Sequence, residues 1–234
     1  MISTKLKHSL KAPFRSIGLD LVVRRPYPLD FLASLNIKTI LDVGAHEGGF
    51  AEEVRAILPA AMLHSFEPVA QSYRRLKRRE AIDPQFKAWN VAIGDQTGSS
   101  QIMVNTMSAS SSFLPLGSLS EHRPDLTVTA QQTVEVITLD DWSRDKSLLT
   151  PMLLKADVQG FEGRVLAGAH ELLSDVSVVI LEVSFEQVYV GQPLFDSIYS
   201  AMINAGFRFH GQYDPWFDPM TARQIQSNAI FERG

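Results

Sequence analysis

The sequence predicts an α/β protein with a Rossmann-like sheet, helices on both faces of that sheet, and an antiparallel hairpin at its C-terminal end. From Ile37 onward, short apolar runs alternate with segments of helical periodicity, which is typical of parallel strands joined by crossover helices. A glycine-containing turn follows the first apolar run directly, as expected between a strand and a helix. The run from Val176 to Val183 is almost wholly apolar and β-branched, as in a strand buried on both faces.

The first half of the chain is expected to supply three strands and two helices in alternation. Strands are predicted at 37–43, 62–66 and 86–92, and helices at 50–58 and 69–79. Pro59 ends the first helix, because proline lacks the amide hydrogen that a helix interior requires.

The segment after the third strand has a different composition. Turn residues at 93–98 lead into a short strand at 101–104, which indicates a hairpin insertion. Residues 105–130 are rich in serine, proline and glycine, and they are too long for an idle connector in a compact domain. We expect this stretch to form a mobile loop over the functional site.

The second half returns to regular elements. Strands are predicted at 133–137, 151–156 and 176–183, and helices at 162–173 and 194–204. Gly206 follows the last helix, where glycine readily adopts the left-handed conformation that ends helices. The tail is expected to pair 207–210 with 225–231 as an antiparallel hairpin at the edge of the sheet.

The composition excludes several classes of protein. The 234 residues carry a net charge of -4, which argues against a role in binding nucleic acid, since such binding depends on excess lysine and arginine. The absence of cysteine excludes thiolate nucleophiles and thiolate metal sites. No apolar run approaches the roughly 18 residues of a transmembrane helix, and the first residues lack a signal-peptide pattern. We therefore expect a cytoplasmic protein.

The first residues of the chain are unusually basic. Residues 1–25 contain six lysine and arginine residues and one aspartate. Either this segment contacts a membrane surface or an anionic substrate, or it is a solvated helix that packs its apolar side on the domain. The second interpretation is preferred, and the predicted organisation is a basic helical extension over residues 1–36 before a domain over residues 37–234.

The strongest local signal is the stretch from Asp42 to Gly49, between a buried strand and a helix. Glycines allow a sharp turn and a close approach to a ligand, and the helix N-terminus offers unpaired N–H groups. The spacing of Gly44 and Gly48 differs from the three-glycine pattern of dinucleotide-binding enzymes, which disfavours a nicotinamide-dependent oxidoreductase. A cofactor with an amino-acid carboxylate and a sulfonium, such as S-adenosylmethionine, fits better.

Acidic side chains at two strand ends suit the two halves of such a cofactor. Asp42 can bind the ammonium group, and Glu67, at the end of the second strand, can accept hydrogen bonds from the ribose hydroxyls. Asn90 follows the third strand, where the adenine edge is expected. The predicted cofactor-binding residues are Asp42, Gly44, Ala45, His46, Gly48, Glu67, Pro68, Asn90, Val91, Ala92 and Asp157.

Five segments in this order resemble the FkbM-type methyltransferases. They are Thr39–Gly48, Phe66–Pro68, Asn90–Asp95, Thr138–Asp140 and Lys155–Glu162, and the last is the most specific. The likeness extends from about Ile37 to Phe231. It implies a seven-stranded methyltransferase sheet over residues 37–234, S-adenosylmethionine as the donor, and mostly O-methylation of sugars, polyketides or other natural products. It does not fix the acceptor.

Three residues are candidates for catalysis. Asp157 ends the fourth strand of the parallel sheet, beside the cofactor turn, and is the first candidate for the general base or for orienting the acceptor. His46 is a second candidate base within the cofactor turn. Glu162 opens the next helix, where a carboxylate can equally serve to stabilise the helix N-terminus.

The predicted function is O-methylation of a small-molecule or saccharide hydroxyl with S-adenosylmethionine. The alternatives are an S-adenosylmethionine-binding protein without catalysis and a methyltransferase with a non-hydroxyl acceptor. Several carboxylates facing one cleft could hold Mg²⁺, but the sequence shows no compact ligand motif, so no metal is preferred. The acceptor and the oligomeric state remain open at this stage.

Overall fold

The computed structural model describes residues 27–234, and residues Phe31–Gly234 form one compact unit. The basic extension predicted for residues 1–36 falls mostly on residues 1–26, which lie outside the described part, as does its suggested membrane contact. A short 3-10 helix, η1 (Asp30–Ser34), precedes the first strand.

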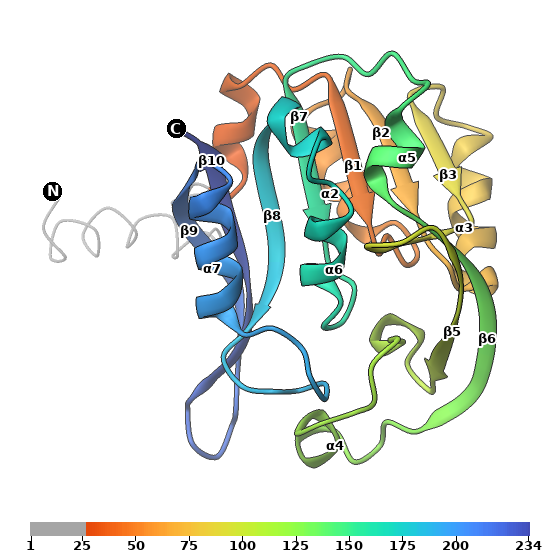
Figure 1. The fold of residues 1–234 in the computed structure, drawn as a ribbon, viewed down its shortest axis with the longest axis vertical. Coiled ribbons are helices and arrows are strands. Elements are labelled where there is room, and N and C mark those ends of the chain that lie inside the picture. The colour runs from red at the N-terminus through yellow and green to blue at the C-terminus, as the bar shows by residue number, and fades with distance from the viewer. Residues whose placement is uncertain (1–26) are drawn as a thin grey trace, which may run out of the picture. The chain divides into compact units, whose positions relative to one another are not determined.

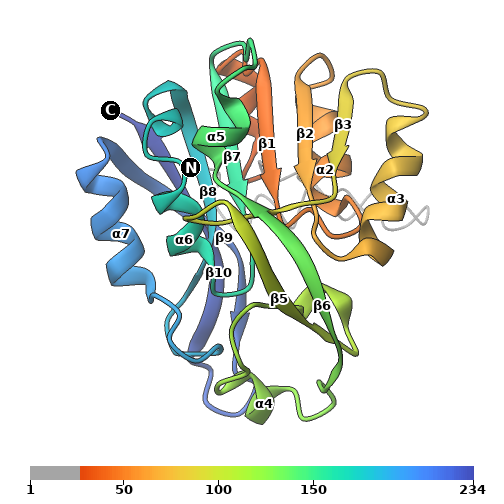
Figure 2. The same cartoon turned by 45° about the vertical axis from the view of Figure 1, so that its right-hand side comes forward.

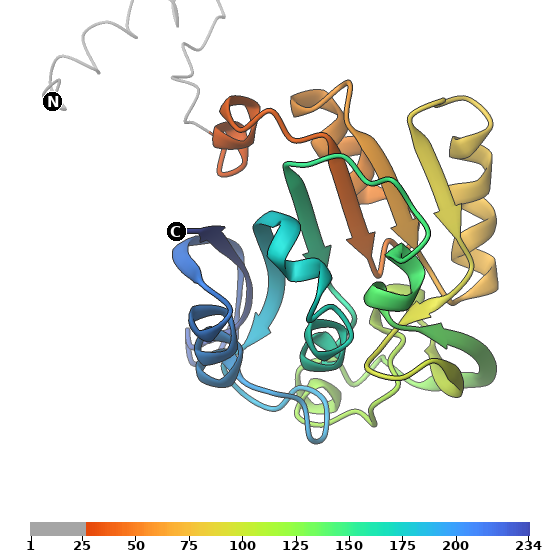
Figure 3. The ribbon, with the colours of Figure 1, turned by 45° about the horizontal axis from the view of Figure 1, so that its top comes forward.

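A seven-stranded mixed sheet forms the centre of the compact unit (Figure 1). Its strand order is β3-β2-β1-β7-β8-β10-β9. The strands are β1 (Thr39–Val43), β2 (Met62–Phe66), β3 (Phe86–Trp89), β7 (Met152–Ala156), β8 (Val176–Ser184), β9 (Phe207–Phe217) and β10 (Gln224–Arg233). The first five of these run parallel, so their carboxyl ends point to one side of the sheet (Figure 3).

Helices cover both faces of this sheet (Figure 2). One face carries α2 (Gly49–Ile57) and α3 (Ala70–Glu80), and the other carries α5 (Leu139–Ser143), α6 (Glu162–Ala167) and α7 (Phe195–Asn204). The C-terminal strands β9 and β10 pair antiparallel, with β9 at the sheet edge. The predicted fold is therefore confirmed, including the C-terminal hairpin.

The core lies between the parallel strands and the helices α6 and α7. Every residue of β1 and β7 is buried, and in β8 all residues except Ser177 and Glu182 are buried. Burial of apolar surface is the main favourable contribution to folding. Pairing of β1 with β7 fixes where the carboxyl ends of these two strands lie. The polar residues of the site come directly after these ends.

The segment between β3 and β7 forms a second, three-stranded sheet of order β4-β6-β5. In chain order, this segment contains β4 (Ala92–Ile93), β5 (Gly98–Asn105), η2 (Ser108–Ser110), α4 (Leu119–His122) and β6 (Val128–Ile137). This sheet lies beyond the carboxyl ends of the parallel strands (Figures 1 and 2). We call residues 98–137 the insertion.

Three local expectations differ from the structure. The strand predicted for 86–92 ends at Trp89, and the antiparallel partner of β5 is β6, which begins more than twenty residues further along the chain. Residues 105–130 carry β-structure, a 3-10 turn and α4, so they are not one long loop.

The helix predicted for 162–173 is also wrong in its length. Helix α6 ends at Ala167, and a 3-10 turn, η3 (Leu172–Asp175), follows. At Gly168 the chain passes so close to Gly94 that an added Cβ would lie 1.9 Å from the Gly94 carbonyl oxygen. The Asp140 carboxylate then accepts from the Leu172 amide at 2.9 Å, which explains the Thr138–Asp140 motif structurally.

Among residues 27–234, no helix combines the length and the apolar character that crossing a bilayer requires.

Candidate functional site

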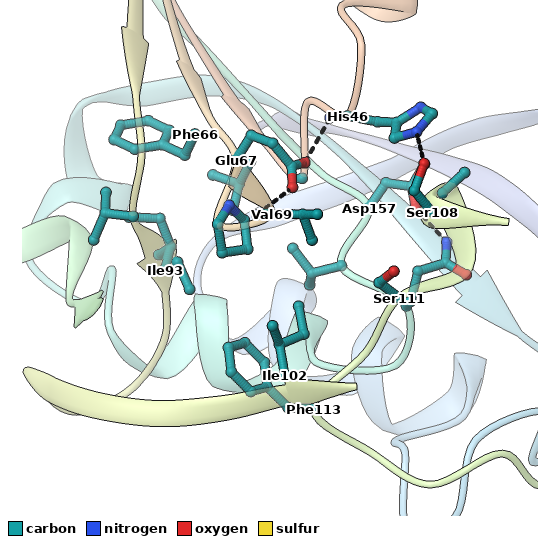
Figure 4. A pocket seen from close by; sticks show the side chains of 18 residues that line it. His46, Phe66, Glu67, Val69, Ile93, Ile102, Ser108, Ser111, Phe113 and Asp157 are labelled. Carbon is teal, nitrogen blue, oxygen red and sulfur yellow. Dashed lines mark hydrogen bonds between the residues drawn. The ribbon is translucent and has the colours of Figure 1, made fainter. Parts of the chain in front are cut away.

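A pocket lies where the carboxyl ends of β1, β2 and β7 meet the insertion (Figure 4). Its polar side is formed by residues that follow these strands, among them His46, Glu67 and Asp157. Open α/β sheets bind ligands at this end of their strands. The parallel sheet thus brings together residues that are more than one hundred positions apart in sequence.

The turn after β1 is shaped by close contact with the end of β7. Gly44 has a φ of +77°, and an added Cβ would lie 1.9 Å from the Asp157 carbonyl oxygen. Only glycine therefore fits at this position. His46 also has a positive φ, of +48°, and Gly48, at +93°, caps the N-terminus of α2. The glycines act mainly by letting the β1 turn lie against Asp157.

Glu67 is buried and holds the first turn from the opposite side. Its Oε2 accepts from the His46 amide at 2.8 Å, and its Oε1 accepts from the Val69 amide at 2.7 Å. Burial raises the pKa of Glu67 to about 7, against the lowering effect of these two amides. Each carboxylate oxygen has a second lone pair, so Glu67 can accept further hydrogen bonds from a ligand.

A buried ion cluster joins β1 to β7. Lys155 Nζ lies 3.2 Å from Asp157 Oδ2 and 4.0 Å from Asp42 Oδ1, and Asp42 Oδ2 accepts from Ser65 Oγ at 3.1 Å. Burial raises the pKa of Asp42, while Lys155 opposes this. Burial alone would lower the pKa of Lys155, but Asp157 and Asp42 outweigh it and raise this pKa. Asp42 Oδ1 is buried without a hydrogen-bond partner.

His46 faces the insertion. Its Nε2 lies 2.7 Å from Ser108 Oγ. Burial lowers the pKa of His46, with a smaller opposing effect of Glu47. The imidazole is therefore neutral at neutral pH and has a nitrogen that can accept a proton.

The wall of the pocket opposite the polar residues is apolar. Ile93, Ile102 and Phe113 lie together on one side, whereas His46 and Ser108 lie on the other (Figure 4). Val69 completes this wall. Sequence reasoning missed these residues, because Ile102 and Phe113 belong to the insertion and no local motif marks them.

The predicted site residues divide into two groups. Those that line the pocket are Gly44, His46, Glu67, Pro68, Val91, Ala92 and Asp157. Those that do not are Asp42, Ala45, Gly48, Asn90 and Glu162. The Asn90 amide donates to the carbonyl oxygens of Glu67 and Pro68, at 2.9 and 3.1 Å, and so fixes the turn after β2.

Glu162 stabilises the turn between β7 and α6. Its Oε1 accepts from the amides of Val158 and Gly160, at 2.9 and 3.3 Å. Burial raises the pKa of Glu162 to about 7. These contacts hold the backbone of the turn that precedes α6.

The residues of the pocket fit an adenosine group. The Glu67 carboxylate has lone pairs free to accept hydrogen bonds from a ribose diol. The apolar wall beside it suits the flat face of a base. The buried Asp42 oxygen without a donor is an acceptor close to the same turn. Within residues 27–234, the structure contains no group of three or more histidine, aspartate or glutamate residues arranged to hold a metal ion.

Comparison with known proteins agrees with this geometry. The family model "Methyltransferase FkbM domain" matches residues 42–209, more than half of the chain. The "2-O-methyltransferase NoeI" of Sinorhizobium fredii (strain NBRC 101917 / NGR234) is 28% identical over 160 residues, which cover 65% of this chain and 66% of that protein.

A solved structure shares the fold. The methyltransferase FkbM from Methylobacillus flagellatus KT superposes with a TM-score of 0.50 at 11% identity, covering 83% of this chain and 44% of that one. The chain thus matches just under two thirds of the curated relative and under half of the solved protein. On the family match, the chain belongs to the FkbM methyltransferase family.

Proposed function

We propose that this protein transfers the methyl group of S-adenosylmethionine to a hydroxyl group of a small molecule or saccharide. The observation that carries the proposal is the position of Asp157, a half-buried carboxylate at the end of β7 that lines the pocket beside Glu67 and His46. The relative named a 2-O-methyltransferase supports a hydroxyl acceptor.

The residues of the pocket have distinct roles in this proposal. Glu67 binds the ribose hydroxyls, and the apolar wall of Val69, Ile102 and Phe113 encloses the adenine. Asp42 would act on the ammonium group of the donor through its charge alone, because its side chain is fully buried and does not line the pocket. When bound, S-adenosylmethionine supplies an electrophilic methyl group on a sulfonium, and the protein must hold the acceptor oxygen in line with it.

The acceptor hydroxyl must lose its proton as the carbon–oxygen bond forms. Asp157 is the proposed proton acceptor, because its two oxygens are held by Lys155 and Gln159 at the mouth of the pocket. His46, a neutral imidazole on the same side, is the alternative base. Lys155 supplies positive charge between the Asp42 and Asp157 carboxylates.

The test combines donor binding with detection of the product. Purified protein is incubated with a cell extract and S-adenosylmethionine that carries a deuterated methyl group, and labelled small molecules are identified by mass spectrometry. We expect a labelled O-methyl product, lost in the Asp157→Asn variant, while calorimetry shows that S-adenosylhomocysteine still binds that variant.

Other outcomes would contradict the proposal at different levels. Binding of S-adenosylhomocysteine without any labelled product would favour a binding protein without catalysis. A labelled nitrogen- or carbon-bound methyl group, seen by NMR of the product, would refute the hydroxyl acceptor. Absence of binding by the folded protein would refute the donor pocket itself.

A further inference from the structure

The side-chain amide of Gln159 contacts three side chains at the edge of the pocket. Its Nε2 donates to Asp157 Oδ1 at 2.7 Å and to Glu182 Oε2 at 3.0 Å. Its Oε1 lies 2.8 Å from the hydroxyl of Tyr189, which is fully buried. Gln159 therefore connects the turn after β7 with the end of β8 and with the loop that follows β8.

The hydrogen bonds admit one orientation of this amide. The NH₂ end of the amide has two hydrogens to donate, and it faces the oxygens of both Asp157 and Glu182. The oxygen end then accepts from the Tyr189 hydroxyl. A half-buried amide whose two donor hydrogens and whose oxygen all have partners is held in one orientation.

The backbone of the same turn is also held from two sides. Gln159 has a φ of +56°, an uncommon conformation for a residue with a side chain. Ser112 of the insertion donates its hydroxyl to the Gln159 carbonyl oxygen at 2.7 Å, and Glu162 binds the amides on either side of it. The insertion and α6 together fix where the side chain of Gln159 begins.

We propose that Gln159 is a positioning residue of the methyl transfer, whose amide holds the Asp157 and Glu182 carboxylates apart in one arrangement and aims Asp157 at the acceptor hydroxyl. This inference rests on the proposed function, in which Asp157 takes the proton. Tyr189 acts one step further away by fixing the orientation of the amide.

The charges around Asp157 explain why such a residue is needed. Burial raises the pKa of Glu182 well above its usual value, and the neighbouring Asp157 and Glu162 raise it further. Lys155 is the buried cation of this group and already pairs with Asp157. Without the side-chain amide of Gln159, the Asp157 and Glu182 carboxyl groups would lose the hydrogen-bond donor that they share. The other titratable groups that interact with Asp157 are Asp42, His46, Glu67, Tyr189 and Tyr213.

The first test measures the carboxylates directly and needs no acceptor. The side-chain carboxyl carbon of Asp157 is labelled with ¹³C, and its NMR signal is assigned through Asp157→Asn. In Gln159→Met, which keeps the length of the side chain but not its donors, we expect the ¹³C chemical shift of this carboxyl group to change, because Asp157 Oδ1 loses its amide donor. Tyr189→Phe, which keeps the packing, should change this chemical shift in the same direction by less.

Matched variants separate positioning from damage to the fold. Gln101→Met changes an exposed glutamine of β5 and should leave this chemical shift unchanged. Adding Glu182→Gln to Gln159→Met removes the opposing carboxylate and should return the Asp157 chemical shift toward that of the wild type. An unchanged Asp157 chemical shift in both Gln159→Met and Tyr189→Phe would overturn the inference.

Kinetics with the acceptor found by isotope labelling provide the second readout. We expect Gln159→Met to lower kcat at least tenfold, to move the acid limb of the pH profile to higher pH, and to change KM for the donor much less. If Gln159→Met had the same turnover and the same pH profile as the wild type, Gln159 would not be a positioning residue. Absence of turnover in the wild type would refute the proposed function, and the NMR measurement of the Asp157 carboxyl group would still decide the role of Gln159.

Discussion

Replacing Gly44 by alanine tests the contact between the first turn and the end of β7. The added Cβ would lie 1.9 Å from the Asp157 carbonyl oxygen and 2.8 Å from its carbonyl carbon, and both atoms belong to the backbone. No side chain can move aside, so β1 and β7 must separate locally. Gly44 also has a φ of +77°, which costs an alanine about 1–2 kcal/mol.

The two effects together give the expected loss of stability. Overpacking in a well-packed region costs about 1–3 kcal/mol, so the sum with the backbone strain is about 2–5 kcal/mol. Urea unfolding, followed by circular dichroism, measures it. Gly49→Ala is the matched control, because nothing lies within 4 Å of its added Cβ and the residue opens α2, so a gain of up to about 1 kcal/mol is expected.

The same variant should also affect the site. Displacement of Asp157 is expected to lower turnover more than donor binding, since the Glu67 side of the pocket is not part of the clash. Equal unfolding midpoints for Gly44→Ala, Gly49→Ala and the wild type, with unchanged denaturant dependence, would refute the reasoning from this close approach.

Two further predictions concern buried carboxylates whose pKa burial raises to about 7. Glu67→Ala should weaken S-adenosylhomocysteine binding by about 1–3 kcal/mol in calorimetry. The affinity of the wild type should fall as the pH drops below about 7, because protonation of Glu67 removes a hydrogen-bond acceptor. Equal affinity of the variant and the wild type would exclude Glu67 from the ribose site. For Glu162, the folded-state pKa lies above the unfolded value of 4.5, so the folded protein binds the proton more tightly and stability falls as the pH rises between these values. Glu162→Gln keeps an oxygen for both turn amides, so its urea midpoint should depend less on pH over this range and its turnover should be retained; a large loss of turnover would instead support a catalytic Glu162.

The sequence predicted those parts of the structure that depend on local pattern. Apolar runs and the residues that follow them placed the parallel strands, and the shared edge of a parallel sheet brought Glu67 and Asp157 into one pocket. The break after Ala167 was missed because it arises from a contact between Gly168 and Gly94, which are distant in sequence. Pairing of β5 with β6 and the apolar wall from Ile102 are likewise set by tertiary contacts.

The site also contains residues whose roles no sequence pattern reveals. Gln159 was part of a recognised motif, but its positive φ and its three side-chain partners become visible only when β8 and the following loop are in place. Asn90 was predicted to bind the cofactor from its place after the third strand, and that position could not show that its side-chain amide also donates to the backbone of the turn after β2.

The order of the last two strands has a consequence for how the protein forms during synthesis. Strand β10 follows β9 along the chain but lies between β9 and β8, so β9 has no neighbour in the sheet until residues 224–233 have left the ribosome. Until then β8, which carries Glu182, has an open edge. A nascent chain stalled before residue 224 would therefore expose an unpaired, apolar strand edge of the kind that chaperones bind and that promotes aggregation.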